Sequence, residues 1–191
     1  MRALVTGFDA FGGASFNTSL TAVRRLPPRV GRIEIRTLEL PTSFARAPQT
    51  LTAAIERLQP DIVLCTGEAG ERAVLSVERV AANRCDARIA DNDGAQLRAV
   101  PVVPGAPDAY LATLPVEKIA AALRAAGLPA EVSQDAGGFV CNHLFYSLLH
   151  FAAGRPLRAG FLHVPRDALA LDDVVRAIGI AVSTAAEPAP A

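Results

Sequence analysis

The sequence is most informative first for what it lacks. Its 19 basic and 19 acidic side chains cancel, so the 191-residue chain carries no net charge that would attract nucleic acid or an anionic membrane. No uncharged apolar run approaches the roughly 20 residues that cross a bilayer. The N-terminus also lacks the sustained apolar segment of a signal peptide. We therefore expect a soluble protein whose partners include neither nucleic acid nor membrane.

The chain also contains few cysteines. The chain has three cysteines, an odd number without CxxC spacing, and this argues against a disulfide framework. Unpaired thiols favour a reducing compartment, so we expect a cytoplasmic location. At this length the chain can form one domain with a substantial core. We expect that domain to span residues 1–185, followed by a disordered Ala/Pro tail at residues 186–191.

The apolar residues that are present alternate between two periodicities. Strand-like segments occur at 2–6, 33–38, 61–66, 74–83, 130–133 and 158–164. Helix-like segments occur at 17–26, 43–58, 115–126, 141–152 and 172–184. Residues 84–113 indicate turns, with at most a short strand near 99–103. This alternation predicts a single-domain, three-layer α/β/α fold with a mainly parallel twisted sheet, in which ligands bind at the carboxyl ends of the strands.

Cys141 stands where one of these helices is expected to begin. Two glycines at 137–138 favour a turn before it, and apolar residues follow it at helical spacing. The free N–H groups and the dipole at a helix start can stabilise a thiolate and a developing oxyanion. Cys141 is therefore a candidate nucleophile. The alternative is a small buried core residue, which is also the simplest interpretation of Cys65 within its apolar strand.

Only three histidines occur, so the partner of Cys141 can be sought by elimination. His143 points to another face of the same helix, and His150 lies roughly 13 Å further along the helix axis. His163 ends the strand that follows this helix, and its side chain can approach the start of the helix. It is the candidate general base, although a core histidine bonded to the backbone is the alternative. A cysteine–histidine pair is most often used for acyl transfer.

The roles of three further side chains stay open on residue patterns alone. Glu78 lies in an extended segment and is either a surface ion-pair partner of Arg79 or a buried acid that orients a histidine. Phe8 and Phe11 lie within a glycine-rich turn, residues 7–13, after the first predicted strand. They either wall an apolar pocket or pack the turn onto the core. This turn lacks the spacing of a nucleotide-binding motif.

Five motifs then carry a resemblance to a known family. They are residues 7–13 (GFDAFGG) with Asn17, residues 67–70 (GEAG) leading into 78–83 (ERVAAN), residues 86–89 (DARI) with Asp91 and Asn92, residues 137–143 (GGFVCNH), and residues 161–165 (FLHVP). Their order and approximate spacing resemble pyroglutamyl peptidase type I, also called pyrrolidone-carboxylate peptidase. The resemblance extends from residue 4 to about residue 180.

This resemblance implies a cytoplasmic cysteine peptidase that removes N-terminal pyroglutamyl (5-oxoprolyl) residues from peptides through a thioester. It implies no metal or other cofactor, and a homo-oligomer, either a dimer or the homotetramer common in the family. By motif, Cys141 resembles the nucleophile, His163 the base and Glu78 the orienting acid. Arg88 resembles the oxyanion residue beside the backbone N–H of Cys141. The substrate-binding residues implied are Phe8, Phe11, Asn17, Glu68, Phe139 and Val140.

The chain departs from the family pattern at three positions. Glu68 and Glu71 replace a glutamine and a glycine, and Thr18 replaces a proline. If the substrate meets Glu68 only through its backbone, that change is harmless. An ionised side chain in the site would accept but not donate hydrogen bonds, and two added carboxylates would repel acidic peptides. The alternatives are therefore a related cysteine amidohydrolase for another small acyl group, or a noncatalytic ligand-binding domain.

Overall fold

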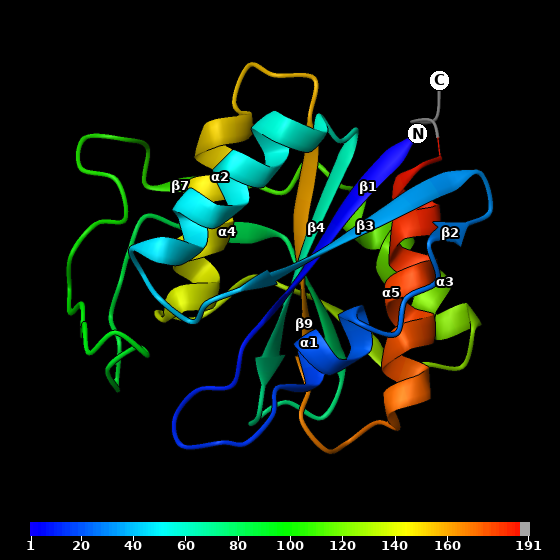
Figure 1. Ribbon diagram of the computed structural model, residues 1–191, viewed down its shortest axis with the longest axis horizontal. Helices are drawn as coiled ribbons and strands as arrows, with labels where there is room; N and C mark the ends of the chain where they lie inside the picture. Colours follow the sequence, from blue (N-terminus) through cyan, green and yellow to red (C-terminus); the bar gives the residue numbers. More distant parts are fainter. Residues whose placement is uncertain (188–191) are drawn as a thin grey trace.

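The computed structural model describes residues 1–187, which form one domain around a seven-stranded sheet (Figure 1). Neighbouring strands run parallel except that β2 is antiparallel to β3 and β5 is antiparallel to β9. The mainly parallel sheet predicted from the sequence is thus confirmed. In spatial order the strands are β2 (Arg29–Val30), β3 (Ile33–Leu40), β1 (Arg2–Phe8), β4 (Ile62–Ala69), β9 (Arg158–Pro165), β5 (Leu75–Glu78) and β8 (Ala130–Ser133).

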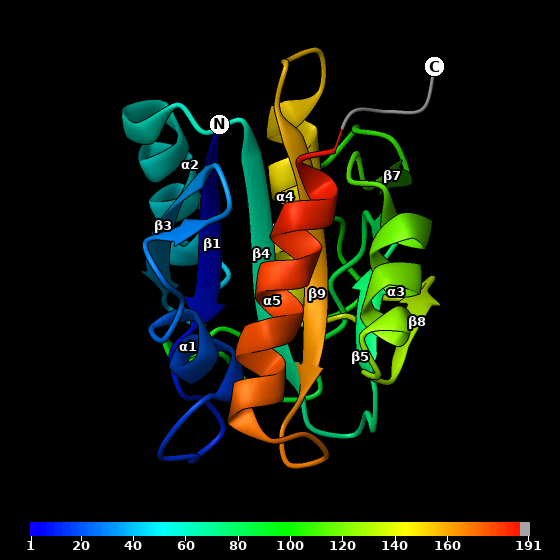
Figure 2. The same cartoon turned by 90° about the vertical axis from the view of Figure 1, so that its right-hand side faces the viewer.

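Helices cover both faces of this sheet, which gives the three layers that the alternating pattern predicts (Figures 1 and 2). The helices α2 (Arg46–Leu58) and α4 (Val140–Ala152) pack on one face. The other face is covered by α1 (Thr18–Val23), α3 (Val116–Ala125) and α5 (Leu171–Ala185). Successive residues of a strand point to opposite faces, so Leu4 belongs to the first core and Val5 to the second.

The central strands β1, β4 and β9 are buried on both faces, and their parallel direction brings their carboxyl ends to one edge of the sheet. Near-continuous apolar sequence of this kind is typical of parallel strands covered by helices. The loops that follow these three strands therefore meet at the same end of the molecule. The start of α4 also lies there, because β9 follows α4 in the chain and runs parallel to β4, so its carboxyl end returns to the edge where α4 begins.

The region from the fourth predicted strand to α3 differs from expectation. The single segment predicted at 74–83 is broken at Arg79 into β5 and β6 (Val80–Ala82), and β6 pairs with β7 (Ala109–Leu111) in a separate two-stranded sheet. At 99–103 the structure has only one bridge, between Cys85 and Val100. Strand formation there depends on partners far away in the sequence, and local composition does not reveal those partners.

Several helix ends also differ from the predicted ones by a few residues. Asn17 caps α1 at the start of the segment predicted as helical at 17–26, but the helix ends at Val23. Ser43 Oγ accepts the N–H of Arg46, where α2 starts, and Pro115 precedes α3 as its cap instead of forming its first residue. The predicted tail at 186–191 falls mostly outside the described residues. No helix within residues 1–187 is long and apolar enough to cross a bilayer.

Candidate active site

Cys141 is the second residue of α4, as the sequence predicts. Phe139 caps the helix, and Gly137 makes the preceding turn with a φ of +83°, a conformation that side chains with a Cβ rarely adopt. The Asn142 side chain fixes this helix start to β6, because its amide donates to the carbonyls of Ala82 and Arg84 and its oxygen accepts the N–H of Ala82. The position of the thiol is therefore set by both the turn and the neighbouring sheet.

The sulfur of Cys141 lies directly over the end of β4. A Cβ built on Gly67 would stand 2.7 Å from Sγ and 2.9 Å from the ring of Phe161, so only glycine leaves room for the thiol. Gly67 is also the register partner of His163 on β9. Cys141 and His163 line one common pocket and lie on the same face of the sheet. The structure thus places both side chains at the same pocket, and their pairing in catalysis stays a prediction.

His163 is held by a completely buried acid. Its Nδ1 lies 2.7 Å from Oε1 of Glu78, and only 4% of the histidine is exposed. The same oxygen accepts from Nη1 of Arg72 at 2.5 Å. Arg79 turns away and pairs with Glu117, which decides between the two interpretations of Glu78. Because Nδ1 is engaged by the carboxylate, Nε2 is the ring nitrogen left to exchange a proton.

Burial dominates the electrostatics of the thiol. Desolvation, followed by the charge of Glu78 and the neighbouring Cys65, raises the pKa of Cys141 from 9.0 to about 12. Arg72 and the backbone N–H of Cys141 oppose this rise in pKa, in the direction that a helix start should act. Their effect is smaller than that of burial. The resting thiol therefore keeps its proton, and a base must remove it during any reaction.

The other two histidines serve elsewhere, as elimination predicted. His143 Nδ1 lies 3.1 Å from Sγ of Cys85, and His150 Nδ1 lies 2.9 Å from the hydroxyl of Tyr110. Although its sequence neighbours are charged, Cys85 is buried, and burial raises its pKa to about 11. Cys65 is a buried core residue as expected. All three cysteines are free thiols.

A pocket of about 600 Å³ opens beside the thiol. Its wall is aromatic on one side, where the ring of Phe139 lies 5.7 Å from that of Phe11 and 5.5 Å from that of Phe44. The sequence did not single out Thr42, Arg72, Ile89 and Arg166, although Ile89 lies in the DARI motif. Every residue predicted to bind substrate lines this pocket, namely Phe8, Phe11, Asn17, Glu68, Phe139 and Val140.

The Glu68 side chain is bonded inside the protein. Oε2 accepts the N–H of Thr18 at 2.7 Å, Oε1 accepts Nε of Arg166 at 2.5 Å, and the side chain is 1% exposed. Glu68 and Thr18, two of the three residues that depart from the family pattern, are thus joined by one hydrogen bond. A proline at position 18 could not donate this bond. The carboxylate is committed to the first turn of α1 and to Arg166.

Arg88 lies on the outer rim of the pocket. Its side chain is 84% exposed and donates to Glu71 at 3.2 Å, and Glu71 is 83% exposed. Both carboxylates that distinguish this chain, Glu68 and Glu71, are therefore paired with arginines. This pairing weakens the repulsion of acidic peptides that the sequence suggested. The oxyanion role of Arg88 stays a prediction.

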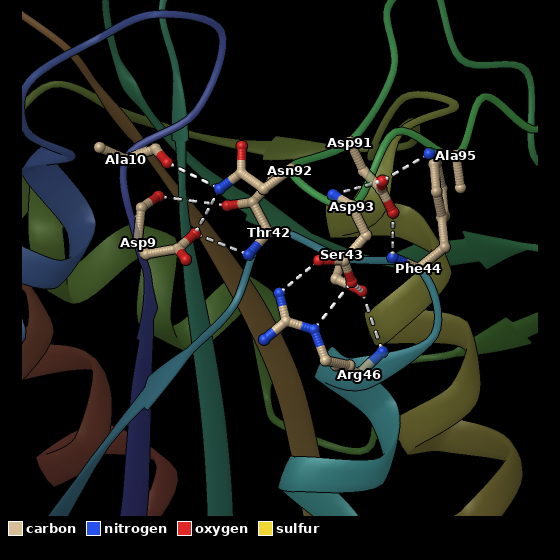
Figure 3. A network of polar contacts seen from close by, with 10 residues as sticks. All are labelled: Asp9, Ala10, Thr42, Ser43, Phe44, Arg46, Asp91, Asn92, Asp93 and Ala95. Carbon is tan, nitrogen blue, oxygen red and sulfur yellow. Dashed lines mark hydrogen bonds and ion pairs between the residues drawn. The ribbon is translucent and has the colours of Figure 1, made fainter.

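A polar network anchors the loops around the pocket (Figure 3). Oδ1 of Asp9 accepts the N–H of Thr42 at 2.6 Å and the amide of Asn92 at 3.1 Å. Asp91 accepts the N–H of Phe44 at 2.8 Å. These bonds join the loop after β1, the entry to α2 and the loop at 91–95. The Asp91 and Asn92 motif thus supports the pocket wall, a function that its sequence position alone did not indicate.

A thiol, an imidazole and a buried carboxylate thus meet at the carboxyl edge of a parallel sheet, beside an aromatic pocket. The fold and the site together define a cysteine-type hydrolase.

Comparison with known proteins narrows this class to one family. The family described as Pyroglutamyl peptidase matches residues 1–187, and the chain belongs to it. A pyrrolidone-carboxylate peptidase of Gloeobacter violaceus is 51% identical over 167 residues, which cover 86% of this chain and 82% of the relative. One from Streptococcus pyogenes is 44% identical over 195 residues, covering 95% and 91%.

Solved structures agree with this assignment. Pyroglutamyl peptidase I from Bacillus amyloliquefaciens superimposes with a TM-score of 0.93 at 40% identity, covering 96% of this chain and 94% of the other. A mutant pyrrolidone carboxyl peptidase from the hyperthermophile Pyrococcus furiosus gives a TM-score of 0.93 at 35% identity, covering 97% and 98%.

Proposed function

We propose that this protein removes N-terminal pyroglutamyl residues from peptides, with Cys141 as nucleophile, His163 as general base and Glu78 as orienting acid. One observation carries the proposal: Cys141 Sγ lies over Gly67, the register partner of a histidine whose Nδ1 is bonded to a fully buried glutamate. The choice of substrate is based on the pyroglutamyl peptidase family to which the chain belongs.

The pocket suits this substrate chemically. Pyroglutamate is a compact neutral lactam without an α-amine, so it needs an apolar slot and a few amide-directed hydrogen bonds. Phe8, Phe11 and Phe139 provide the apolar wall. A site for an ordinary N-terminus would need a free carboxylate, whereas Glu68 is already bonded to Arg166 and to a backbone N–H. We propose that the ring meets Glu68 through its backbone.

The proposed reaction starts from a neutral pair. His163 Nε2 takes the proton of Cys141 as Sγ attacks the acyl carbon, and the oxyanion forms beside the backbone N–H of Cys141 and Arg88. The carbon–nitrogen bond then breaks, and the imidazolium gives its proton to the departing amine, which leaves a thioester. His163 next activates water, whose attack breaks the carbon–sulfur bond and releases pyroglutamate.

Hydrolysis of a fluorogenic pyroglutamyl amide by wild type, Cys141→Ala and the matched control Cys65→Ala tests the proposal. We expect turnover in wild type and in Cys65→Ala, and its loss in Cys141→Ala. Thiol-dependent turnover of other acyl amides alone would favour the related amidohydrolase. If wild type shows no thiol-dependent turnover of any amide, the ligand-binding alternative stands and the proposal fails.

We further propose that the protein acts in the cytoplasm as a homo-oligomer, either a dimer or a tetramer. Three free thiols support a reducing compartment. Exposed large apolar side chains, Phe16 and Leu111 among them, support burial of part of this surface between copies. Light scattering coupled to size-exclusion chromatography gives the subunit count, and a monomer at micromolar concentration would contradict the oligomer.

A further inference from the structure

We propose that Arg72 is a positioning residue for this reaction: it supplies the positive charge beside the buried Glu78 carboxylate, aligns that carboxylate on His163, and ties it to the loop that precedes Cys141. The inference rests on the proposed function for its kinetic consequences. Its structural basis is the pair of contacts that Arg72 makes with Glu78 and Asp135, which the sequence motifs did not predict.

Arg72 stands between the acid and the loop before the nucleophile. It follows β4, where its own N–H bonds the carbonyl of Ala69 and closes a turn. Nη1 donates to Oε1 of Glu78 at 2.5 Å, and Nη2 donates to the carbonyl of Asp135 at 2.7 Å. The side chain is 25% exposed, so water screens the contact with Glu78 only in part. The guanidinium of Arg72 therefore links the acid Glu78 to the loop that precedes the nucleophile.

Glu78 needs a cation because it is wholly removed from water. Its exposure is 0%, and Oε2 has no hydrogen-bond partner among the described residues. A buried carboxylate without a compensating charge takes up a proton. A protonated Glu78 would stabilise an imidazolium poorly, so the base would weaken. His163 and Arg72 both donate to Oε1, and Arg72 is the permanent cation of the two.

The second arm of Arg72 acts on the approach to α4. Asp135 accepts the N–H of Gly137 through Oδ1 at 2.8 Å, and Gly137 makes the left-handed turn that precedes Cys141. By holding the Asp135 carbonyl, Arg72 links the position of this turn to the position of Glu78. Among the described residues, the titratable partners bonded to Glu78 are His163 on β9 and Arg72, and its charge also acts on Cys141 of α4. Of these three groups, Arg72 carries the fixed positive charge.

Arg72 also lines the pocket, so a direct role in substrate binding is the competing explanation. Its two terminal nitrogens are both bonded to protein atoms, which argues against that role. The two explanations differ in kinetics. A positioning residue changes kcat, whereas a binding residue changes KM with kcat preserved.

The test compares Arg72→Met and Arg72→Lys with the matched control Arg79→Met, whose arginine pairs with Glu117 outside the pocket. We expect Arg72→Met to lower kcat by about 10- to 100-fold, as loss of an outer partner of a functional group does. KM should stay within about twofold, and Arg72→Lys should recover part of the loss because it restores the charge. Arg79→Met should keep wild-type kcat.

The pH dependence gives a readout that a merely structural role would not move. The ratio of wild-type to Arg72→Met activity should fall as pH rises, because a higher pH favours the charged form of a buried carboxylate that has lost its cation. Millimolar guanidinium should raise the activity of Arg72→Met and leave that of Arg79→Met unchanged. A raised KM with unchanged kcat, or a ratio that is independent of pH with no rescue, would overturn the proposal.

Alkylation of Cys141 by iodoacetamide, located by mass spectrometry, tests the same idea without a peptide substrate. Cys65 and Cys85 are buried, so Cys141 is the thiol that the reagent can reach. Its alkylation rate in wild type should exceed that in Arg72→Met most strongly at low pH. If wild type fails to hydrolyse pyroglutamyl amides but this difference appears, the proposed function fails and the positioning role stands. Equal alkylation rates of wild type and Arg72→Met at every pH would contradict the positioning role.

Discussion

Gly67 leaves the space that the sulfur of Cys141 occupies. A β-carbon at residue 67 would stand 2.7 Å from Sγ, closer than real Cβ atoms come to other heavy atoms. The φ of Gly67 is not in the left-handed region, so the requirement for glycine is one of space. The end of β4 thereby fixes how far the thiol reaches toward His163, which is the neighbour of Gly67 on β9.

Gly67→Ala should therefore damage activity far more than folding. Displacing the thiol by about 1 Å can cost about 100-fold in rate, so we expect kcat/KM to fall by that order. The matched control is Gly160→Ala, whose Cβ would meet Leu114 at 2.7 Å and lies away from the pocket. Both variants should lose about 1–3 kcal/mol of unfolding free energy in urea titrations. Equal kcat/KM in the two variants would contradict the spatial role of Gly67.

Glu68→Gln should lower stability without changing acyl preference. An amide cannot replace the charge-assisted bond to Arg166, so we expect the unfolding free energy to fall by about 1–2 kcal/mol. Selectivity for pyroglutamyl over other acyl amides should stay as in wild type, because the side chain faces α1 and Arg166. Glu71→Gln, at an exposed pair, is the control and should change stability by less than about 0.5 kcal/mol. Altered acyl selectivity in Glu68→Gln would place the side chain in the substrate site.

His143 should make the fold sensitive to acid. Burial lowers its pKa from 6.5 to about 4, so the folded state holds this histidine neutral while the unfolded chain binds a proton below about pH 6.5. Stability from this group is therefore present above pH 6.5 and is lost as pH falls toward 4, by roughly 1–3 kcal/mol. Urea unfolding of wild type and His143→Gln at pH 7 and pH 4.5 checks the sign. The variant should lose less stability between the two pH values, and an equal loss would refute this assignment.

Asp9→Ala should raise KM by loosening the pocket wall. The substitution removes an acceptor for the N–H of Thr42 and the amide of Asn92, so the loop that carries Phe11 loses two of the bonds that anchor it (Figure 3). We expect KM to increase by about tenfold, since the two lost hydrogen bonds together contribute about 1–2 kcal/mol and about 1.4 kcal/mol is tenfold in affinity. Asp61→Ala is the control, because Asp61 accepts the N–H of Arg2 at the far end of β1. A similar KM in both variants would mean that the loop needs no anchor.

Much of this architecture could be predicted because local pattern decided it. The apolar runs of β1, β4 and β9, the stripe of α4 and the turn at Gly137 are properties of neighbouring residues, and all were recovered within a few positions. Elimination among three histidines pointed to His163, which the structure places at the pocket with Cys141. The motif order carried the family assignment, which the match over residues 1–187 confirms.

Long-range pairing decided the rest. No local pattern shows that β5 runs antiparallel to β9, which is what brings Glu78 beside His163, or that β7 pairs with β6. The guanidinium of Arg72 meets Glu78 and Asp135 only after three separate segments have folded together. Sequence alone determined which side chains can do the chemistry. Tertiary packing decided their charge and alignment, because desolvation and hydrogen bonding depend on neighbours that the chain brings from far away.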